Sequence, residues 1–172
     1  VSSVPAASKA VAAPEGASEI VVLVNGIEAW VEAGAQRCAL SSQKYLPDVC
    51  YPDESRRIVG FTRSPWPTWR FRLDDGSTVE QEIFVDRDAC ETVLRWRRRG
   101  GAGAARLVVR PLLSGRDYHA LHRENGGFDF RAVTERGNVA WRPYPGLPAV
   151  TPATSAAGGS SAAPPPEWCH PR

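Results

Sequence analysis

The sequence predicts an all-β domain, an antiparallel twisted β-sandwich of the supersandwich type with disordered ends. Apolar side chains in residues 19–150 recur mainly at every second position, which places them on one face of a strand. Turn-forming residues interrupt this part of the chain about every ten residues, as they do between short antiparallel strands. Helical periodicity never extends beyond about ten residues. About eight strands are expected, enough for two facing sheets.

The two ends of the chain differ in composition from its middle. Residues 1–18 are mostly Ala, Ser, Val and Pro, and residues 151–172 contain five Pro, five Ala, three Ser and two Gly. Such segments bury too little apolar surface to offset the loss of chain entropy on folding. We therefore expect a disordered N-terminal segment over residues 1–18, one domain over residues 19–150 and a disordered tail over residues 151–172.

The first predicted strand pair surrounds the dipeptide Asn25-Gly26. It follows the apolar run of residues 20–24 and precedes residues 27–32. Both residues of an Asn-Gly pair tolerate positive φ, so the pair is the strongest short signal for a hairpin. A hairpin turn is therefore expected at Asn25 and Gly26.

The strand at residues 69–73 alternates strictly. Trp69, Phe71 and Leu73 share one face, and Arg70 and Arg72 share the other. A turn at residues 74–77 is expected to return the chain. The remaining predicted strands are residues 78–85, 92–97, 106–113, 128–134 and 138–141, the last two forming a hairpin around residues 135–137. Pro111 indicates a strand end or an edge strand, because proline cannot donate to a ladder.

Charge and hydropathy restrict the partners. The chain has 172 residues, and 21 basic against 19 acidic residues leave a net charge of +2, too balanced to predict nucleic acid or an anionic membrane as partner. The longest apolar run, residues 20–24, is far shorter than the roughly 18–20 residues that span a bilayer. No secretory signal is recognisable in the first residues. We expect no membrane partner and no nucleic-acid partner.

The cysteines and histidines predict neither a disulfide scaffold nor a metal site. Cysteines stand at positions 38, 50, 90 and 169 without a C-x-x-C pair, as expected of free thiols in a reducing cytoplasm. His119 and His122 lack a third ligand at a typical zinc spacing. No metal or other cofactor is expected.

The densest group of polar residues follows the strand at residues 106–113. Arg116, Asp117, His119, His122 and Glu124 place donors, acceptors and imidazoles within nine residues. Such a set could serve acid and base chemistry, since histidine titrates near neutrality. Alternatively, it is an ordered loop whose side chains satisfy one another and cap the backbone. The spacing alone leaves both interpretations open.

Three other groups could carry function. Prolines on both sides of Trp66 hold its backbone extended, so the indole could stack on a sugar ring, or it could fill the core. Residues 95–99 combine four arginines with Trp96, as in a single-stranded nucleic-acid surface or a solvated strand face. The carboxylate pairs at residues 74–75 and at Glu80 and Glu82 resemble glycosidase acids only in residue type.

Several sequence segments between residues 25 and 148 are similar to segments of one enzyme family. They are residues 64–76 (SPWPTWRFRLDDG), 81–85 (QEIFV), 110–119 (RPLLSGRDYH) with Glu124 and Asn125, and 141–148 (WRPYPGLP), with residues 25–30 and 40–45 upstream. Taken in order, they resemble the N-terminal domain of bacterial and archaeal glycogen debranching enzymes. The resemblance implies a large twisted β-sandwich that precedes an (α/α)6 barrel, which hydrolyses α-1,6-glucosidic branch points of glycogen with two carboxylates.

The resemblance also has gaps. The family's upstream segment, with an Asn-Gly-rich strand and an Arg-x-Tyr-His-Gly motif, is not found in this sequence, and neither is the barrel. The chain is therefore expected to be truncated at both ends relative to the family and to be marginally stable alone. No carboxylate in it receives the family's acid or base role.

These observations combine into one expectation and two alternatives. We expect a non-catalytic N-terminal portion of a cytoplasmic glycogen debranching enzyme, which packs on the (α/α)6 barrel in cis or in trans and contacts glycogen or a branched α-glucan. The alternatives are an independent carbohydrate-binding module and a nucleic-acid-binding β domain that uses residues 95–99. The candidate substrate-binding or domain-interface residues are Trp66, Arg116, Asp117, Tyr118 and His119.

Overall fold

A computed structural model describes residues 3–10, 20–53, 55–89, 91–119, 123, 126–135 and 138–154, with residues 3–10, 135 and 138 by their backbone alone. These residues form strands and one short 3₁₀ helix, Ser55–Arg57. The strands are β1 (Ser3–Ala10), β2 (Val21–Ala33), β3 (Gln36–Ala39), β4 (Lys44–Tyr45), β5 (Val49–Cys50), β6 (Ile58–Thr62), β7 (Thr68–Arg72), β8 (Thr78–Asp86), β9 (Glu91–Arg99), β10 (Arg106–Asp117), β11 (Ala132–Glu135), β12 (Asn138–Trp141) and β13 (Val150–Thr154).

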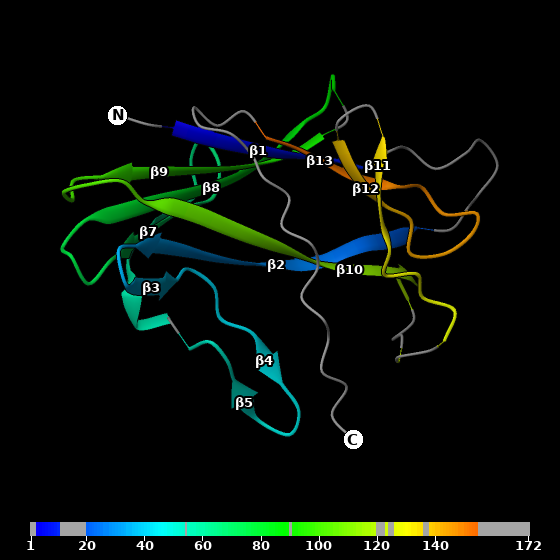
Figure 1. Cartoon of the computed structure of the whole chain (residues 1–172), viewed down its shortest axis with the longest axis horizontal. Coiled ribbons are helices and arrows are strands. Elements are labelled where there is room, and N and C mark those ends of the chain that lie inside the picture. The colour runs from blue at the N-terminus through cyan, green and yellow to red at the C-terminus, as the bar shows by residue number, and fades with distance from the viewer. Residues whose placement is uncertain are drawn as a thin grey trace.

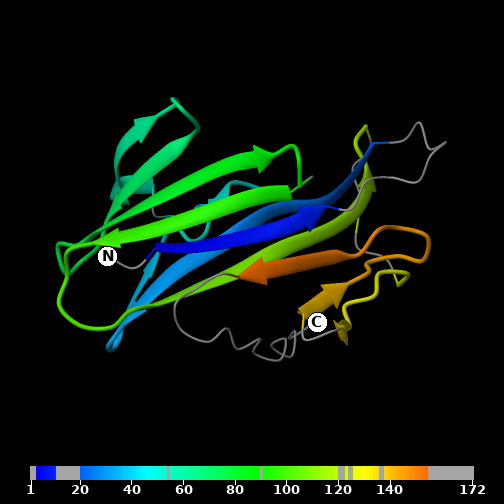
Figure 2. The same ribbon diagram turned by 90° about the horizontal axis from the view of Figure 1, so that it is seen from above.

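The strands form two facing sheets and a separate hairpin. The larger sheet has the order β11-β12-β13-β1-β9-β8-β7-β6, and the smaller one the order β10-β2-β3. β4 and β5 pair only with each other and extend away from both sheets (Figure 1). All pairings are antiparallel. Figure 2 shows the long strands β2 and β10 running beneath the larger sheet. The predicted antiparallel sandwich is confirmed.

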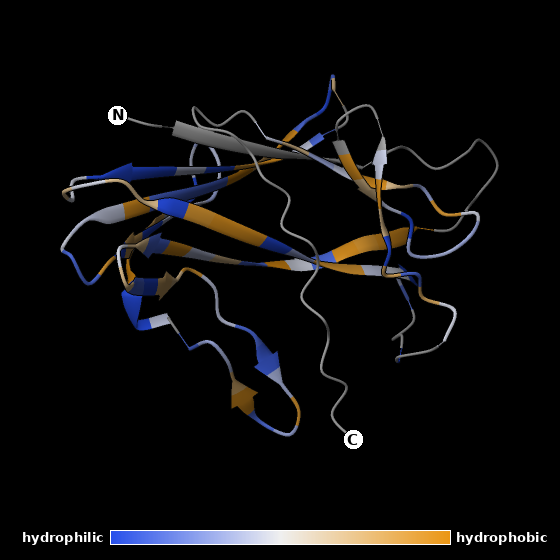
Figure 3. Ribbon diagram, viewed as in Figure 1, coloured by the Kyte–Doolittle hydropathy of each residue, from blue (hydrophilic) through white to orange (hydrophobic). Residues whose placement is uncertain are grey.

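The core lies between β7, β8 and β9 of the larger sheet and β2 and β3 of the smaller one. Phe71 and Leu73 are 4% and 5% exposed, and Trp69 packs against them, whereas Arg70 and Arg72 face solvent. Trp96 on β9 is also buried. The predicted alternation of residues 69–73 is confirmed, and Figure 3 shows the long strands carrying hydrophobic residues alongside hydrophilic ones.

The predicted turn between β7 and β8 is also confirmed. Gly76 has a φ of 77°, a conformation that favours glycine. The Asp75 carboxylate accepts hydrogen bonds from the backbone N–H of Ser77 at 2.9 Å and from its hydroxyl at 2.5 Å. This Asx geometry fixes the register in which β8 returns beside β7.

The hairpin predicted at Asn25-Gly26 is wrong. β2 runs through both residues and pairs along its length with β10. Gly26 faces Leu112 and Val24 faces Leu113, so Asn25 is the extra residue of a β-bulge. A bulge uses the same backbone freedom as a tight turn, and the long partner strand β10 decides between the two outcomes.

Pro111 lies within β10, on the outer edge of the smaller sheet. The edge position that the proline indicated is confirmed, because a strand with one neighbour can dispense with one N–H donor. The strand does not end there, however, and continues to Asp117. The last predicted hairpin is formed by β11 and β12, which pair from Ala132 with Trp141 to Glu135 with Asn138.

The described parts of the two chain ends are paired strands. Residues 3–10, which composition assigned to a disordered segment, form β1 between β13 and β9, and residues 151–154 of the expected tail belong to β13. Backbone pairing with neighbours on both sides requires no large side chains, so a composition poor in large apolar residues does not prevent a paired strand. Residues 1–2, 11–19 and 155–172 lie outside the described residues.

The core arrangement predicts a large difference between two phenylalanines. Phe71→Ala should lower the free energy of unfolding by about 3–5 kcal/mol, because it leaves a cavity between the sheets. Phe130→Ala is the matched control, since Phe130 is 56% exposed, and should change it by less than about 1 kcal/mol. Urea unfolding measures both variants. A similar loss in both would show that Phe71 is not part of the core.

Candidate functional site

The candidate residues Arg116, Asp117, Tyr118 and His119 form a braced turn at the end of β10. The Arg116 guanidinium donates from Nη1 to the carbonyl oxygens of Asp117 and Tyr118 at 3.1 and 3.2 Å, and from Nε to Oδ1 of Asn25 at 3.2 Å. Asp117 Oδ1 accepts the backbone N–H of His119 at 2.6 Å. The backbone N–H of Tyr118 donates to the carbonyl of Ile20. The structure thus brings four of the five candidates together.

Gly115 determines where this turn lies. Its φ of 144° is one that side chains rarely adopt, and a Cβ built there would come within 2.6 Å of the Tyr144 ring. Tyr144 in turn packs edge-on against Phe128, with ring centroids 5.5 Å apart. β10 therefore ends against the segment that joins β12 to β13, and only glycine permits the contact.

Two side chains of the turn face outward. Tyr118 is 58% exposed, and the His119 ring is exposed and meets it edge-on with centroids 5.1 Å apart. Arg116 and Asp117 act on the backbone of the turn, so a brace is the role that their contacts show. His122, Glu124 and Asn125 lie outside the described residues. Within the described part of the chain, no group of three or more His, Cys, Asp or Glu could hold a metal ion.

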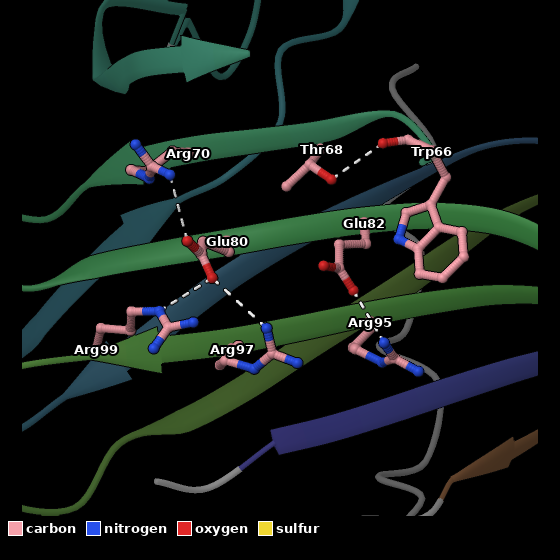
Figure 4. A network of polar contacts seen from close by, with 8 residues as sticks. All are labelled: Trp66, Thr68, Arg70, Glu80, Glu82, Arg95, Arg97 and Arg99. Atoms are coloured by element: carbon pink, nitrogen blue, oxygen red, sulfur yellow. Dashed lines mark hydrogen bonds and ion pairs between the residues drawn. The ribbon is translucent and has the colours of Figure 1, made fainter. Parts of the chain in front are cut away.

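Trp66, the fifth candidate, lies on the other sheet. It is half-buried just before β7, and its ring stacks on Phe84 of β8 with centroids 4.7 Å apart and planes tilted by 30°. The Thr68 hydroxyl donates to the Trp66 carbonyl at 3.1 Å. Arg95 lies over the other ring of this pair, 5.2 Å from the Phe84 centroid. The indole is thus fixed on the outward face of the larger sheet (Figure 4).

The arginines of residues 95–99 are paired with carboxylates. Glu80, whose side chain is 13% exposed, contacts Arg99 at 3.0 Å, Arg70 at 3.4 Å and Arg97 at 3.6 Å, as Figure 4 shows. Arg95 contacts Glu82 at 3.2 Å. All of these side chains lie on the face of β7, β8 and β9 that points away from the core. On this face the glutamates of β8 lie between the arginines of β7 and those of β9.

Trp96 is absent from this outward face. It is 3% exposed in the core, where its indole N–H donates to Gln81. The interleaving of aromatic and basic residues expected of a nucleic-acid surface is therefore not present at this position. The alternation of residues 92–97 in the sequence already places Trp96 on the face opposite to Arg95 and Arg97, but it does not show which carboxylates pair with the arginines.

Asp74, Asp75 and Glu80, three of the four carboxylates that resemble glycosidase acids in residue type, have pKa values below their usual range. Hydrogen bonds from Arg57 and from the buried Cys38 thiol lower the pKa of Asp74, and hydrogen bonds from Ser77 and Arg98 lower that of Asp75. Burial favours the neutral form of Glu80, but its contacts with Arg99 and Arg70 outweigh this and lower its pKa. A glycosidase acid requires a raised pKa, so these groups are not suited to that role.

Sequence reasoning missed a buried carboxylate, Glu28. It is 7% exposed on the face of β2 that points away from the core. Arg110 of β10 binds it with two N–H groups, and the Tyr45 hydroxyl of β4 lies 3.5 Å away. The pair links the smaller sheet to the base of the β4–β5 hairpin. No local pattern predicts a contact between residues so far apart in the sequence.

Sequence reasoning also missed an exposed apolar surface, which we call the hairpin surface. It consists of the large hydrophobic side chains that β4, β5, their turns and β6 leave in solvent: Tyr45, Leu46, Val49, Tyr51, Ile58, Val59 and Phe61. Leu46 is 94% exposed and Tyr51 is 72% exposed. Figure 3 shows hydrophobic residues on β5 and on the turn before it. In the sequence, the apolar residues on both sides of Pro47 and Asp48 could have indicated this surface, because they flank two turn-forming residues.

The described chain is an antiparallel β domain with Glu80 and Glu82 paired to arginines on its outward face and exposed apolar side chains on its hairpin surface. Residues 8–171 match the family described as "Glycogen debranching enzyme N terminal", and the chain belongs to this family. Comparisons with curated proteins and with solved structures found no match. Among the described residues, no helix has the length and hydropathy needed to cross a bilayer.

The ion pairs of the outward face predict how stability depends on pH. The pKa of Glu80 in the folded state lies below the unfolded value of 4.5, so its stabilisation is complete above that pH and is lost as the pH falls through the folded pKa. Asp129, held by Arg131 at a pKa of about 2, extends this loss toward pH 2. Glu80→Gln should lower the free energy of unfolding at pH 7 by about 1 kcal/mol, because its arginine partners reach solvent.

Urea unfolding at pH 7 and pH 3 tests this. The difference between Glu80→Gln and the natural chain should shrink at pH 3. The matched control is Glu91→Gln at the start of β9, where Glu91 forms no ion pair within the described residues. Equal effects of both variants at both pH values would contradict a stabilising network at Glu80.

Proposed function

We propose that this chain is the non-catalytic N-terminal portion of a cytoplasmic glycogen debranching enzyme. It packs on the catalytic (α/α)6 barrel, in cis or in trans, and contacts the branched α-glucan on which the barrel acts. Membership of the family supports association with a catalytic part. The hairpin surface is the observation that carries the packing role.

The hairpin surface fits a domain interface better than it fits open solvent. Seven large hydrophobic side chains are exposed on the β4–β5 hairpin, on its turns and on the edge strand β6 that follows in the sequence. The ion pair between Lys44 and Asp48 of the hairpin, at 2.7 Å, leaves these two residues without net charge. Exposed apolar patches of this kind mark protein interaction sites. We assign the catalytic part of the enzyme as their partner.

The candidate residues of the two sheets are assigned to the glucan. Trp66 lies beside charged and hydroxyl side chains on the outward face, and Tyr118 and His119 project from the braced turn. An aromatic ring next to hydrogen-bonding groups suits a sugar, whose rings have apolar faces and polar edges. We propose that Arg116 and Asp117 position Tyr118 and His119.

The nucleic-acid alternative is less well supported. Glu80 and Glu82 oppose the arginines of β9, and Trp96 is buried beneath them. Salt-dependent binding of this chain to single-stranded RNA or DNA would favour the nucleic-acid alternative. The other alternative, an independent carbohydrate-binding module, requires that this chain bind glucan without the catalytic part.

The packing role predicts the effect of one exposed residue. Leu46→Asp should weaken binding of this chain to the catalytic part of a glycogen debranching enzyme at least about tenfold, which is 1.4 kcal/mol. The fold should be unaffected, since Leu46 is 94% exposed. The control is Val133→Asp on β11, which is 53% exposed and outside the hairpin surface. Isothermal titration calorimetry measures both. Equal affinity for both variants would argue against this interface.

The braced turn predicts a separation of two effects. In a complete debranching enzyme carrying this motif, His119→Ala should lower activity on branched glucan while leaving the melting temperature within about 2 °C of the natural value. Asp117→Ala should lower the melting temperature as well, because it removes the acceptor of the His119 N–H. If His119→Ala lowers both equally, or leaves activity unchanged, the turn is only a brace.

A further inference from the structure

A pocket of about 310 Å³ opens between the two sheets, away from the candidate residues discussed above. One wall is formed by Trp69 and Phe71 of β7 and Gln81 of β8. The opposite wall is the segment that follows β3, together with Ile27 and Ala29 of β2. Its volume is at the lower end of the range for small-molecule sites, about 300–1,000 Å³.

The polar groups of this pocket are all uncharged. They are the side chains of Ser41, Ser42, Gln43, Ser55 and Gln81, and no acidic or basic residue of the described chain lines the pocket. A charged ligand would lose its hydration there and find no opposite charge in return. The lining therefore selects for a neutral ligand that forms hydrogen bonds.

Two of these groups are held in fixed orientations by the fold. Gln81 accepts the Trp96 indole N–H at 2.9 Å through Oε1, which leaves its Nε2 hydrogens without a partner in the described part of the chain. Gln43 donates from Nε2 to the carbonyl of Ile27 at 3.0 Å, which leaves its Oε1 as an acceptor. One donor and one acceptor are thus prepared in advance.

A hydroxyl and an aromatic ring complete the set. Ser41 Oγ accepts the backbone N–H of Ala29 at 3.3 Å, so its own hydrogen can be donated to a ligand. Trp69, half-buried on the same wall as Gln81, is braced by Phe61 with ring centroids 5.1 Å apart. Hydrogen-bonding groups placed next to an aromatic ring match a pyranose, which has hydroxyls around an apolar face.

We propose that this pocket binds one neutral hexose residue of a glucan chain. The choice of glucan rests on the proposed function, whereas the choice of a neutral sugar rests on the pocket itself. An apolar side chain of a protein partner fits less well, because it would cover the Gln81 donor and the Gln43 acceptor without replacing their hydrogen bonds to water.

The chain allows a direct test with an internal control. It contains three glutamines: Gln43 and Gln81 line the pocket, and Gln36 is exposed on β3. In the full chain with ¹⁵N-labelled glutamine, maltotriose should shift the side-chain amide signals of Gln43 and Gln81 and leave that of Gln36 unchanged. Glucose 6-phosphate, a charged sugar, should shift none of them at the same concentration.

A pair of variants tests the donor. Gln81→Glu keeps the oxygen that accepts from Trp96 and replaces the amide donor by a charged acceptor, so it should weaken maltotriose binding at least about tenfold. Gln36→Glu is the matched control and should leave binding unchanged. If Gln81→Glu fails to fold, the experiment with labelled glutamine decides on the natural chain alone.

The proposal is overturned if saturating maltotriose shifts neither pocket glutamine, if it shifts all three equally, or if glucose 6-phosphate shifts the same signals. None of these results bears on whether the chain binds a catalytic part through the hairpin surface. Conversely, the chain could fail to bind the catalytic part and still show the shifts of Gln43 and Gln81. That result would support the sugar pocket and contradict the proposed packing role.

Discussion

The structure depends on the register of β7, β8 and β9. This register places Trp69, Gln81 and Trp96 in one row and Arg70, Glu80 and Arg97 in the next. The first row faces the core and the second faces solvent. A slip of one residue would carry arginines and glutamates into the core and expose the tryptophans. The turn at Asp75 to Ser77 fixes the register, and the hydrophobic core stabilises it.

The same register determines what each face of the larger sheet contributes. On the outward face, the arginine partners of Glu80 lower its pKa, so this carboxylate stabilises the sheet and is not suited to donate a proton. The hairpin surface adjoins the pocket: the Gln43 carbonyl accepts the N–H of Tyr51, and Ile58 of β6 lines the pocket. A protein contact and a sugar contact would therefore be neighbours.

Much of the fold could be predicted from the sequence, because it depends on local alternation. The strand at Trp69 to Leu73, the turn after it and the final hairpin follow from period two and from turn residues. The error at Asn25-Gly26 has a physical cause, since a bulge and a tight turn use the same backbone freedom and only the partner strand β10 distinguishes them. The candidate turn at residues 116–119 was found as a cluster. Its brace geometry, the Glu28–Arg110 pair and the pocket arise from contacts distant in sequence, which no local pattern contains.

The proposed packing of this chain on a catalytic part through the hairpin surface is testable by hydrogen–deuterium exchange of the full chain, with and without the catalytic part of a glycogen debranching enzyme. We expect slower exchange over residues 44–62 and unchanged exchange over β8 and β9. Slower exchange over β8 and β9 with no change at the hairpin would contradict it and would place the interface on the arginine and glutamate face.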